Sequence, residues 1–308
     1  MATGNMKRLF ISLFAMLAMC SAWAGAEEDA LAAYERKDYA TVVKIVKTPA
    51  LKGEGWAQNW LADAYANGEG VVLNNVEALK WYRLAAQQGQ LPAQVQLGFM
   101  YSKGLGAVKD YSEALKWWKL AAQQGNASSQ YRLGLMYEYG FGVVQDYAEA
   151  ARWHLLAAKQ GQASAQSHLG ILYSQGNGVV QNYAESAKWL KLAAQQGESN
   201  AQFNLGVLFD SGKGVVQNYA EAVKWYRLAA QQEDSTAQFN LGSMYVSGAG
   251  VVQDHAKAHS WFNLAAVNGN ASAIKARDSI AKKMTSQQIS DAQKMASDCQ
   301  ARQLKGCD

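Results

Sequence analysis

The chain has 308 residues, of which 49% are hydrophobic and 18% are charged, and its formal net charge is +4 at pH 7. Two of the positive charges belong to Lys7 and Arg8, and the others are scattered along the chain. A nucleic-acid surface needs Lys and Arg clustered on one face, so the sequence argues against nucleic acid as a partner. Pro49 and Pro92 are the two prolines in a composition rich in Ala, Leu and Gln, which favours helices.

Residues 1–26 have the three parts of a secretory signal peptide. Lys7 and Arg8 form a basic start, residues 9–19 form an apolar run, and small residues follow that allow cleavage after Ala24 or Ala26. The apolar run is too short to cross a bilayer comfortably, and no later segment approaches the length of a span. We therefore expect secretion across the inner membrane to the periplasm, with no transmembrane segment in the mature chain.

Three alternatives concern this leader. Residues 17–20 have the outline of a lipoprotein signal, but the bulky Met19 stands where such signals carry a small residue, so soluble export is favoured over a lipid anchor on Cys20. An apolar helix retained in a cytoplasmic protein is disfavoured, because the basic start, short core and small-residue end occur together. Met6 is a second candidate start, with residues 1–5 as an upstream addition.

Residues 27–55 predict a divergent N-terminal capping repeat and a linker. The motif Asp-Tyr-Ala at residues 38–40 returns later in the chain, where a Trp follows it, but no Trp follows it here. Terminal units of repeat proteins expose one face to water and depart from the consensus. A proline and two glycines place the linker at residues 48–55.

The phrase ALKWYRLAAQQG, which begins at Ala78 and ends at Gly89, returns with small changes five more times. Its Trp recurs every 36 residues without insertion or deletion, at Trp81, Trp117, Trp153, Trp189, Trp225 and Trp261. A fixed period of this length predicts a solenoid, in which the core lies between neighbouring repeats. We therefore expect one continuous body.

The other half of each unit is as regular. It contains the motif Ala93-Gln94-x-x-Leu97-Gly98, followed by a Gly-x-Gly loop that begins at Gly104. The same residues recur at the same 36-residue spacing. Residues 57–269 thereby resemble the Sel1-like repeat family, relatives of the tetratricopeptide repeats. The resemblance implies an all-α, right-handed α/α superhelical solenoid with six repeats over residues 56–270. It also implies an adaptor that holds other proteins together, and bacterial members are often exported.

Apolar spacing within a repeat predicts two helices. In the first helix, Leu133, Met136 and Tyr137 recur at i, i+3 and i+4, and in the second helix Trp153 belongs to a similar stripe. Gly134 and its equivalents lack a side chain where the helices approach closely. We expect each of these glycines to accommodate the large recurrent Trp.

Polar residues predict how these helices begin and end. Asp110 and Glu113, with their equivalents, have the spacing of a capping box at the start of the second helix. The Gly-x-Gly loop permits the left-handed conformation that ends the first helix. One basic residue stands beside most of the recurrent Trp residues, and we expect these to form a solvated stripe: Lys80, Lys116, Arg152, Lys188 and Lys224.

Residues 271–308 predict a C-terminal cap and tail. After residues 271–283, Thr285 opens a final helix that extends to about Gln303. Cys299 and Cys307 are the only cysteines left once the leader is removed, so in an oxidising compartment we expect them to form a disulfide. The alternative is two free thiols on a frayed end.

Two patterns suggest chemistry, and each has a plainer explanation. His255 and His259 have the spacing of two metal ligands on a helix, but no third ligand is evident and His-Glu-x-x-His is absent. Ser272 and Ser279 each begin a Ser-x-x-Lys match, and some cysteine-rich relatives are described as β-lactamase-like or penicillin-binding. However, these repeats contain no cysteine, and Ser-Asp-Asn and Lys-Thr-Gly are absent. We predict no catalytic residues, no metal and no cofactor.

The positions that vary within the fixed frame are the ones able to encode a partner. On the first helix these are the two residues before the Leu and the one after the Gly, and tetratricopeptide geometry implies that they line a concave groove. The first column is Val95, Tyr131, Ser167, Phe203 and Phe239, the second is Gln96, Arg132, His168, Asn204 and Asn240, and the third is Phe99, Leu135, Ile171, Val207 and Ser243. From them we select ten protein-binding residues: Tyr131, Arg132, Leu135, His168, Ile171, Phe203, Asn204, Val207, Phe239 and Asn240.

Aromatic anchors interleaved with Arg, Asn and His are typical of a surface that binds protein. The alternative is that Phe203 and Phe239 pack into the neighbouring repeat. We therefore expect an exported, monomeric, non-catalytic scaffold that recognises another protein through the groove. The resemblance leaves two further roles open: an immunity protein that neutralises a secreted toxin or effector enzyme and, more distantly, an enzyme of β-lactam chemistry.

Overall fold

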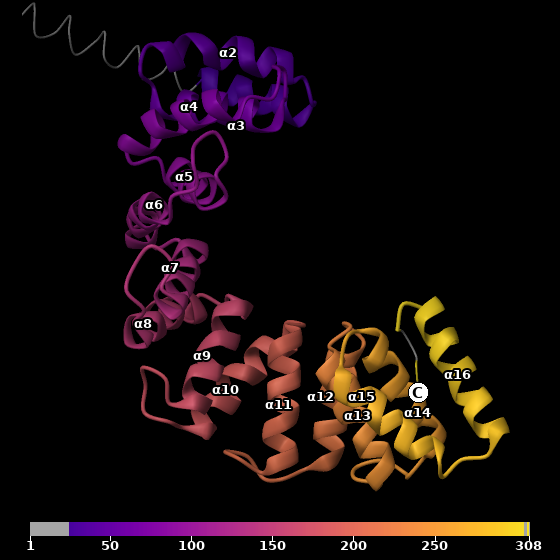
Figure 1. The fold of residues 1–308 in the computed structure, drawn as a ribbon. Coiled ribbons are helices and arrows are strands. Elements are labelled where there is room, and N and C mark those ends of the chain that lie inside the picture. The colour runs from indigo at the N-terminus through magenta and orange to yellow at the C-terminus, as the bar shows by residue number, and fades with distance from the viewer. Residues whose placement is uncertain (1–24, 305–306, 308) are drawn as a thin grey trace, which may run out of the picture. The chain divides into compact units, whose positions relative to one another are not determined.

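The computed structural model describes residues 25–304 and 307, and all regular secondary structure in them is helical (Figure 1). The predicted leader therefore lies outside the described residues, apart from its last two positions. A helix over residues 25–35 is followed by α2 (Tyr39–Leu51), α3 (Gly55–Asn67), α4 (Asn75–Gln87), α5 (Leu91–Lys103), α6 (Tyr111–Gln123), α7 (Ala127–Tyr139), α8 (Tyr147–Lys159), α9 (Ala163–Gln175), α10 (Tyr183–Gln195), α11 (Ser199–Ser211), α12 (Tyr219–Ala230), α13 (Ser235–Ser247), α14 (His255–Val267), α15 (Ala271–Ala281) and α16 (Ser286–Ala301).

These helices form an α/α solenoid, and their contacts divide the chain into two compact units, residues 1–144 and 145–308. In the first unit, each helix from α2 to α7 packs against its neighbours in the sequence. In the second unit, α8 to α15 do the same, and α16 packs against α14. In a solenoid each repeat contacts only adjacent repeats, so no long-range contacts join distant ones.

The helix ends follow the polar signals only in part. Gly104 ends α5 with a φ of 72°, which confirms the predicted left-handed cap. The Asp110 carboxylate accepts hydrogen bonds from two backbone N–H groups of α6, but Glu113 pairs with Lys116 at 2.5 Å and does not return to the cap. Among the described helices, only α16 has a complete capping box. The capping-box prediction for the repeats is wrong in its second half, because the i,i+3 ion pair takes the glutamate.

A ladder of buried glutamines joins consecutive helix pairs. Gln202 donates its Nε2 to the Ala194 carbonyl at 3.2 Å, and its Oε1 accepts from Gln232 Nε2 at 2.8 Å. Gln232 Nε2 also reaches the Gly197 carbonyl at 2.9 Å. The donation to an alanine carbonyl eight residues earlier recurs at Gln58, Gln94, Gln130, Gln166, Gln202 and Gln238. Each repeat is thus pinned to the end of the preceding second helix by its interior amide.

The predicted N-terminal linker is shorter than expected. Helix α2 continues through Pro49 to Leu51, so the connection to α3 is confined to residues 52–54. A proline removes one helical hydrogen bond, and here Val46 and Ala50 are buried on the same face of the helix. Their burial holds the last turn despite the proline.

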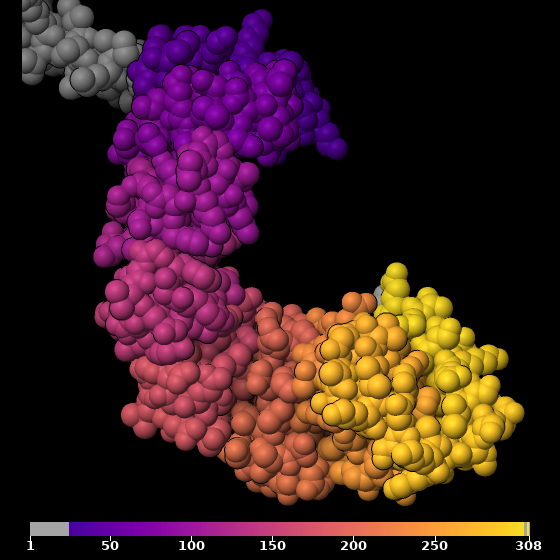
Figure 2. Space-filling model, viewed as in Figure 1, coloured from indigo at the N-terminus to yellow at the C-terminus, as the bar shows by residue number. Residues whose placement is uncertain are grey.

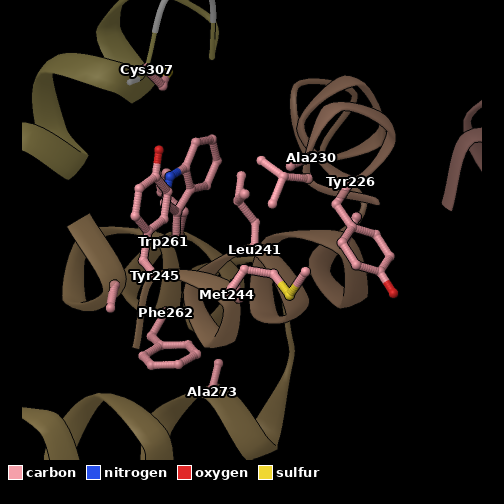
Figure 3. Close-up of a cluster of buried hydrophobic side chains, with 14 of the residues drawn as sticks. Tyr226, Ala230, Leu241, Met244, Tyr245, Trp261, Phe262, Ala273 and Cys307 are labelled. Carbon is pink, nitrogen blue, oxygen red and sulfur yellow. The ribbon is translucent and has the colours of Figure 1, made fainter. Parts of the chain in front are cut away.

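The C-terminal helices cover the end of the last repeat in the second unit (Figure 2). The core there contains Leu241, Tyr245, Trp261 and Phe262, all at most 4% exposed (Figure 3). Cys299 and Cys307 are buried in the same cluster and form a disulfide with a Cα–Cα distance of 5.2 Å. Helix α16 ends at Ala301, two residues before the predicted end.

Candidate functional site

The ten residues predicted to bind protein are all half-buried. The first unit carries three of them on α7, and the second unit carries two on α9, three on α11 and two on α13: Tyr131, Arg132 and Leu135 in the first, and His168, Ile171, Phe203, Asn204, Val207, Phe239 and Asn240 in the second. All of them lie on the first helix of a repeat. The residues at these variable positions therefore keep part of each side chain exposed to solvent, while the surrounding repeat sequence stays constant.

A buried column lies against these residues, and the sequence analysis missed it. It consists of the residue that follows each recurrent Trp, and every member is at most 4% exposed: Tyr82, Trp118, His154, Leu190, Tyr226 and Phe262. We call it the inner column. Its members vary widely in chemistry inside an otherwise constant phrase, which is the signal that could have revealed it.

The inner column, and not the recurrent Trp, fills the space opposite the recurrent Gly. A methyl group on Gly206 would lie 2.7 Å from the Tyr226 ring, and one on Gly242 would lie 2.7 Å from the Phe262 ring. The prediction that Gly accommodates the recurrent Trp is therefore wrong. Successive residues of an α-helix point about 100° apart, so Trp225 faces a different core, in which the residues of α10 and α11 are buried.

The first column contacts the inner column of its own repeat. The Phe203 ring lies 6.0 Å from the Tyr226 ring, and Phe239 lies 5.5 Å from Phe262. In the first unit, Trp118 donates its indole N–H to the Val95 carbonyl at 3.2 Å. Phe203 and Phe239 therefore pack on the second helix of their own repeat, while remaining partly exposed. The aromatic side chains thus have both a structural contact and an accessible edge.

The second column contacts the inner column of the preceding repeat. The Arg132 guanidinium lies over the Trp118 ring at 5.2 Å, and the His168 ring stacks on His154 at 5.1 Å. Asn240 acts on the Tyr226 hydroxyl, whose pKa it lowers. Trp118 and Tyr226 are therefore each placed between the first column of their own repeat and the second column of the next.

Burial and the nearby Asp210 carboxylate raise the pKa of Tyr226 above its ordinary value, and they outweigh the opposite effect of Asn240. The hydroxyl donates to Asp210 Oδ2 at 3.3 Å. The phenol is consequently neutral at physiological pH. It acts as a hydrogen-bond donor that orients its neighbours and is not available as a general base.

Each unit has a cavity at the same position of the repeat. A cavity of about 190 Å³ in the first unit is lined by Ser102, Lys103, Tyr111, Trp118, Arg132, Leu135, Met136, Tyr139 and Phe141. A cavity of about 230 Å³ in the second unit is lined by Ser243, Val246, Phe262, Ala276, Ser279, Ile280 and Lys283. Trp118 and Phe262 occupy equivalent positions in repeats that are four apart, and so do Arg132 and Ala276. Helix α15 thus supplies the positions that a further first helix would supply.

The remaining residues that the sequence analysis singled out can also be placed in the structure. His259 is 2% exposed, and burial, followed by the charge of Arg277, lowers its pKa, so it is not a surface ligand beside His255. Ser272 and Ser279 are exposed on α15. The predicted solvated stripe is confirmed, because its five basic residues are 57–75% exposed and each pairs with the Glu three residues earlier. Such exposed pairs contribute little stability.

Asp63 in the first unit is a carboxyl group in an apolar setting. Burial raises its pKa to about 6, a hydrogen bond donated by the Tyr82 hydroxyl opposes this rise, and the charge of Glu69 adds to it. Asn59 also donates to the carboxylate, at 3.0 Å. Because the pKa is higher in the folded protein than in the unfolded chain, protonation of Asp63 favours folding.

This coupling predicts that the wild type and Asp63→Asn differ in their free energy of unfolding, and that this difference depends on pH. The stabilisation from protonated Asp63 is fully present below the unfolded pKa and is lost as the pH rises through about 6. Between pH 5 and pH 7.5 the wild type should therefore lose about 1.4 kcal/mol of unfolding free energy relative to the variant. Urea unfolding at both pH values tests this, and a constant difference between the two proteins would contradict it.

Comparison with known proteins agrees with this architecture. The Sel1 repeat model matches residues 57–90, 91–126, 127–162, 163–198, 199–234 and 235–270. A Sel1 repeat protein from Oxalobacter formigenes is 30% identical with a TM-score of 0.68, and the match covers 78% of this chain and 96% of that one. A protective antigen of uropathogenic Escherichia coli is 27% identical with a TM-score of 0.48, covering 87% and 81%.

An immunity protein from Pseudomonas aeruginosa is 21% identical with a TM-score of 0.41, covering 68% of this chain and 83% of that one. No curated protein matches the chain. The six matched repeats account for the helix pairs, the Gly caps and the glutamine ladder. The chain belongs to the Sel1 repeat family.

Proposed function

We propose that the protein is a non-catalytic scaffold that binds another protein through the face formed by the first helices of its repeats. The observation that supports this most directly is the state of the ten variable residues. All are half-buried, and the buried inner column holds several of them in place. Partly exposed aromatic and polar side chains on a rigid framework are typical of protein interfaces. The side chains need little ordering before a partner arrives, which reduces the entropic cost of binding.

We further propose that the chain acts outside the cytoplasm, in the periplasm, as a monomer. The support is the basic, apolar and small-residue order of residues 1–26. Within the described part of the chain, no helix combines the length and apolar character that crossing a membrane requires. Mass measurement of the protein purified from fractionated cells tests this. An intact N-terminus on a cytoplasmic protein would refute it.

Affinity capture from an envelope extract tests the binding role. The variant Phe203→Val with Val207→Ser places at two positions the residues that other repeats carry there, Val95 and Ser243, so the frame should tolerate both. We expect this variant to recover about tenfold less of one partner than the wild type, as for loss of an interface hot spot. Circular dichroism should show unchanged helicity.

The matched control is Lys188→Ala with Lys224→Ala, on the exposed stripe. It should retain the partner. If only the stripe control loses the partner, the interface lies on another face of the protein. If neither the wild type nor any variant captures a partner, the scaffold role is refuted. A secreted toxin or enzyme as the captured partner would specify an immunity protein, whereas an envelope complex would specify an adaptor.

A further inference from the structure

The cavity of the first unit has a size that excludes most complete ligands. At about 190 Å³ it lies below the roughly 300–1,000 Å³ of sites that enclose a cofactor or small molecule. It is open between the end of α5, the start of α6 and the face of α7. A cavity of this volume suits one large side chain of a segment whose backbone runs outside it.

Aromatic rings surround this cavity. Tyr111 and Phe141 stack with ring centroids 5.2 Å apart, and Tyr139 lies 5.7 Å from Phe141. Tyr139 and Phe141 are 53% and 42% exposed, although both are large. Exposed rings next to a cavity are the anchors on which a second aromatic side chain stacks or packs edge to face. The walls therefore favour an aromatic guest over an aliphatic one.

Positive charge lies at the same place. The Arg132 guanidinium is held over Trp118 at 5.2 Å and over Phe99 at 5.8 Å, and the Lys109 ammonium lies over Tyr111 at 4.5 Å. Lys103 completes the lining. In the described residues, none of these three cations forms an ion pair. A guanidinium that stacks on a ring still presents its N–H edge, which matches a carboxylate in a bidentate arrangement.

The equivalent cavity of the second unit lacks this combination. Ala276 stands where Arg132 stands, Ser279 replaces Leu135, and Lys283 replaces Tyr139. The frame thus creates the cavity in both units, but only the first unit gives it an aromatic rim and a stacked arginine. This difference shows that the chemistry of the first cavity is not required by the repeat itself.

We infer that the first-unit cavity anchors a partner segment in which an aromatic side chain is followed directly by acidic residues. The aromatic ring enters between Trp118, Tyr139 and Phe141, and the adjacent carboxylates meet Arg132 and the two lysines. This inference rests on the proposed scaffold function and specifies the chemistry of the segment that the scaffold recognises.

A fluorescein-labelled peptide with one tryptophan followed by two glutamates, flanked by glycine and serine, tests the inference with the full chain. Fluorescence anisotropy should show saturable binding, weakened about tenfold or more when lysines replace the glutamates or alanine replaces the tryptophan. Arg132→Asn should weaken binding of the acidic peptide by a similar factor and leave the lysine peptide unaffected. Asn204 and Asn240 occupy this position in other repeats, so the variant should fold.

A second variant tests the rim without touching the core. Tyr139→Ser with Phe141→Ala introduces residues found at these positions elsewhere, Ser211 and Ala249, and both side chains are exposed. It should lower affinity about tenfold, whereas the matched control, Ser279→Ala with Lys283→Ala in the second cavity, should not. Absence of saturable binding, equal binding of the lysine peptide, or full binding by Arg132→Asn would each overturn the inference. Because envelope capture uses variants of α11 in the second unit, the scaffold function and this cavity can fail independently.

Discussion

Replacement of Gln202 by leucine is expected to lower the free energy of unfolding by about 3 kcal/mol. The side chain is 4% exposed, and its amide both donates to the Ala194 carbonyl and accepts from Gln232. Leucine has a similar size but can do neither, so the buried Ala194 carbonyl loses its side-chain donor and Gln232 loses one of its two acceptors. A lost hydrogen bond costs about 1 kcal/mol, and an unsatisfied buried group adds about 1–3 kcal/mol.

Urea unfolding followed by circular dichroism measures this effect, with the slope checked for a change in cooperativity. Gln195→Leu is the matched control, because Gln195 is exposed on the neighbouring helix and takes no part in the ladder. The control should change stability by no more than about 0.5 kcal/mol. Equal effects of the two substitutions would show that the ladder does not hold the repeats together.

Gly206→Ala is expected to destabilise the second unit by about 2 kcal/mol, although alanine is the better helix former. The added methyl group would meet the Tyr226 ring at 2.7–2.8 Å, and that ring is 1% exposed and bonded to Asp210. Overpacking of this kind costs about 1–3 kcal/mol, and the greater helix propensity of alanine returns about 1 kcal/mol. Because the ring is confined on several sides, we place the clash at the upper end of that range.

A double-mutant cycle with Tyr226→Ala isolates the clash. Without the ring, Gly206→Ala should become neutral or stabilising by up to about 1 kcal/mol, so the two substitutions should couple strongly. Chemical denaturation of the four proteins provides the measurement. Additive effects would mean that Gly206 serves another purpose, such as close approach of the backbones.

Much of the fold follows from local signals that recur in every repeat. The period of 36 residues, the left-handed Gly104 cap and the exposed basic stripe depend on residues that act within one helix or one turn. Such signals do not require knowledge of the neighbouring repeats. The ten variable positions were selected by the same logic, as positions that change from repeat to repeat within a constant frame.

The orientation of the second helix could not be read in this way. Trp225 and Tyr226 are adjacent, large and both buried, so apolar spacing alone does not tell which one faces Gly206. That choice depends on how the two helices cross, which is a tertiary property. Tyr139 and Phe141 were missed for a different reason, because they lie at the helix end and in the loop, outside the three columns considered.

The position of Tyr226 between Phe203 and Asn240 has an evolutionary consequence. Phe203 belongs to the repeat that contains Tyr226, whereas Asn240 belongs to the next one. Duplication and recombination act on whole repeats, but the cluster that shapes the surface spans two of them. A repeat that is moved would therefore take with it only its own part of the cluster at each of its two ends, and new surfaces would form at both junctions. Diversity in recognition can thus arise from the reordering of repeats alone, without a single point mutation.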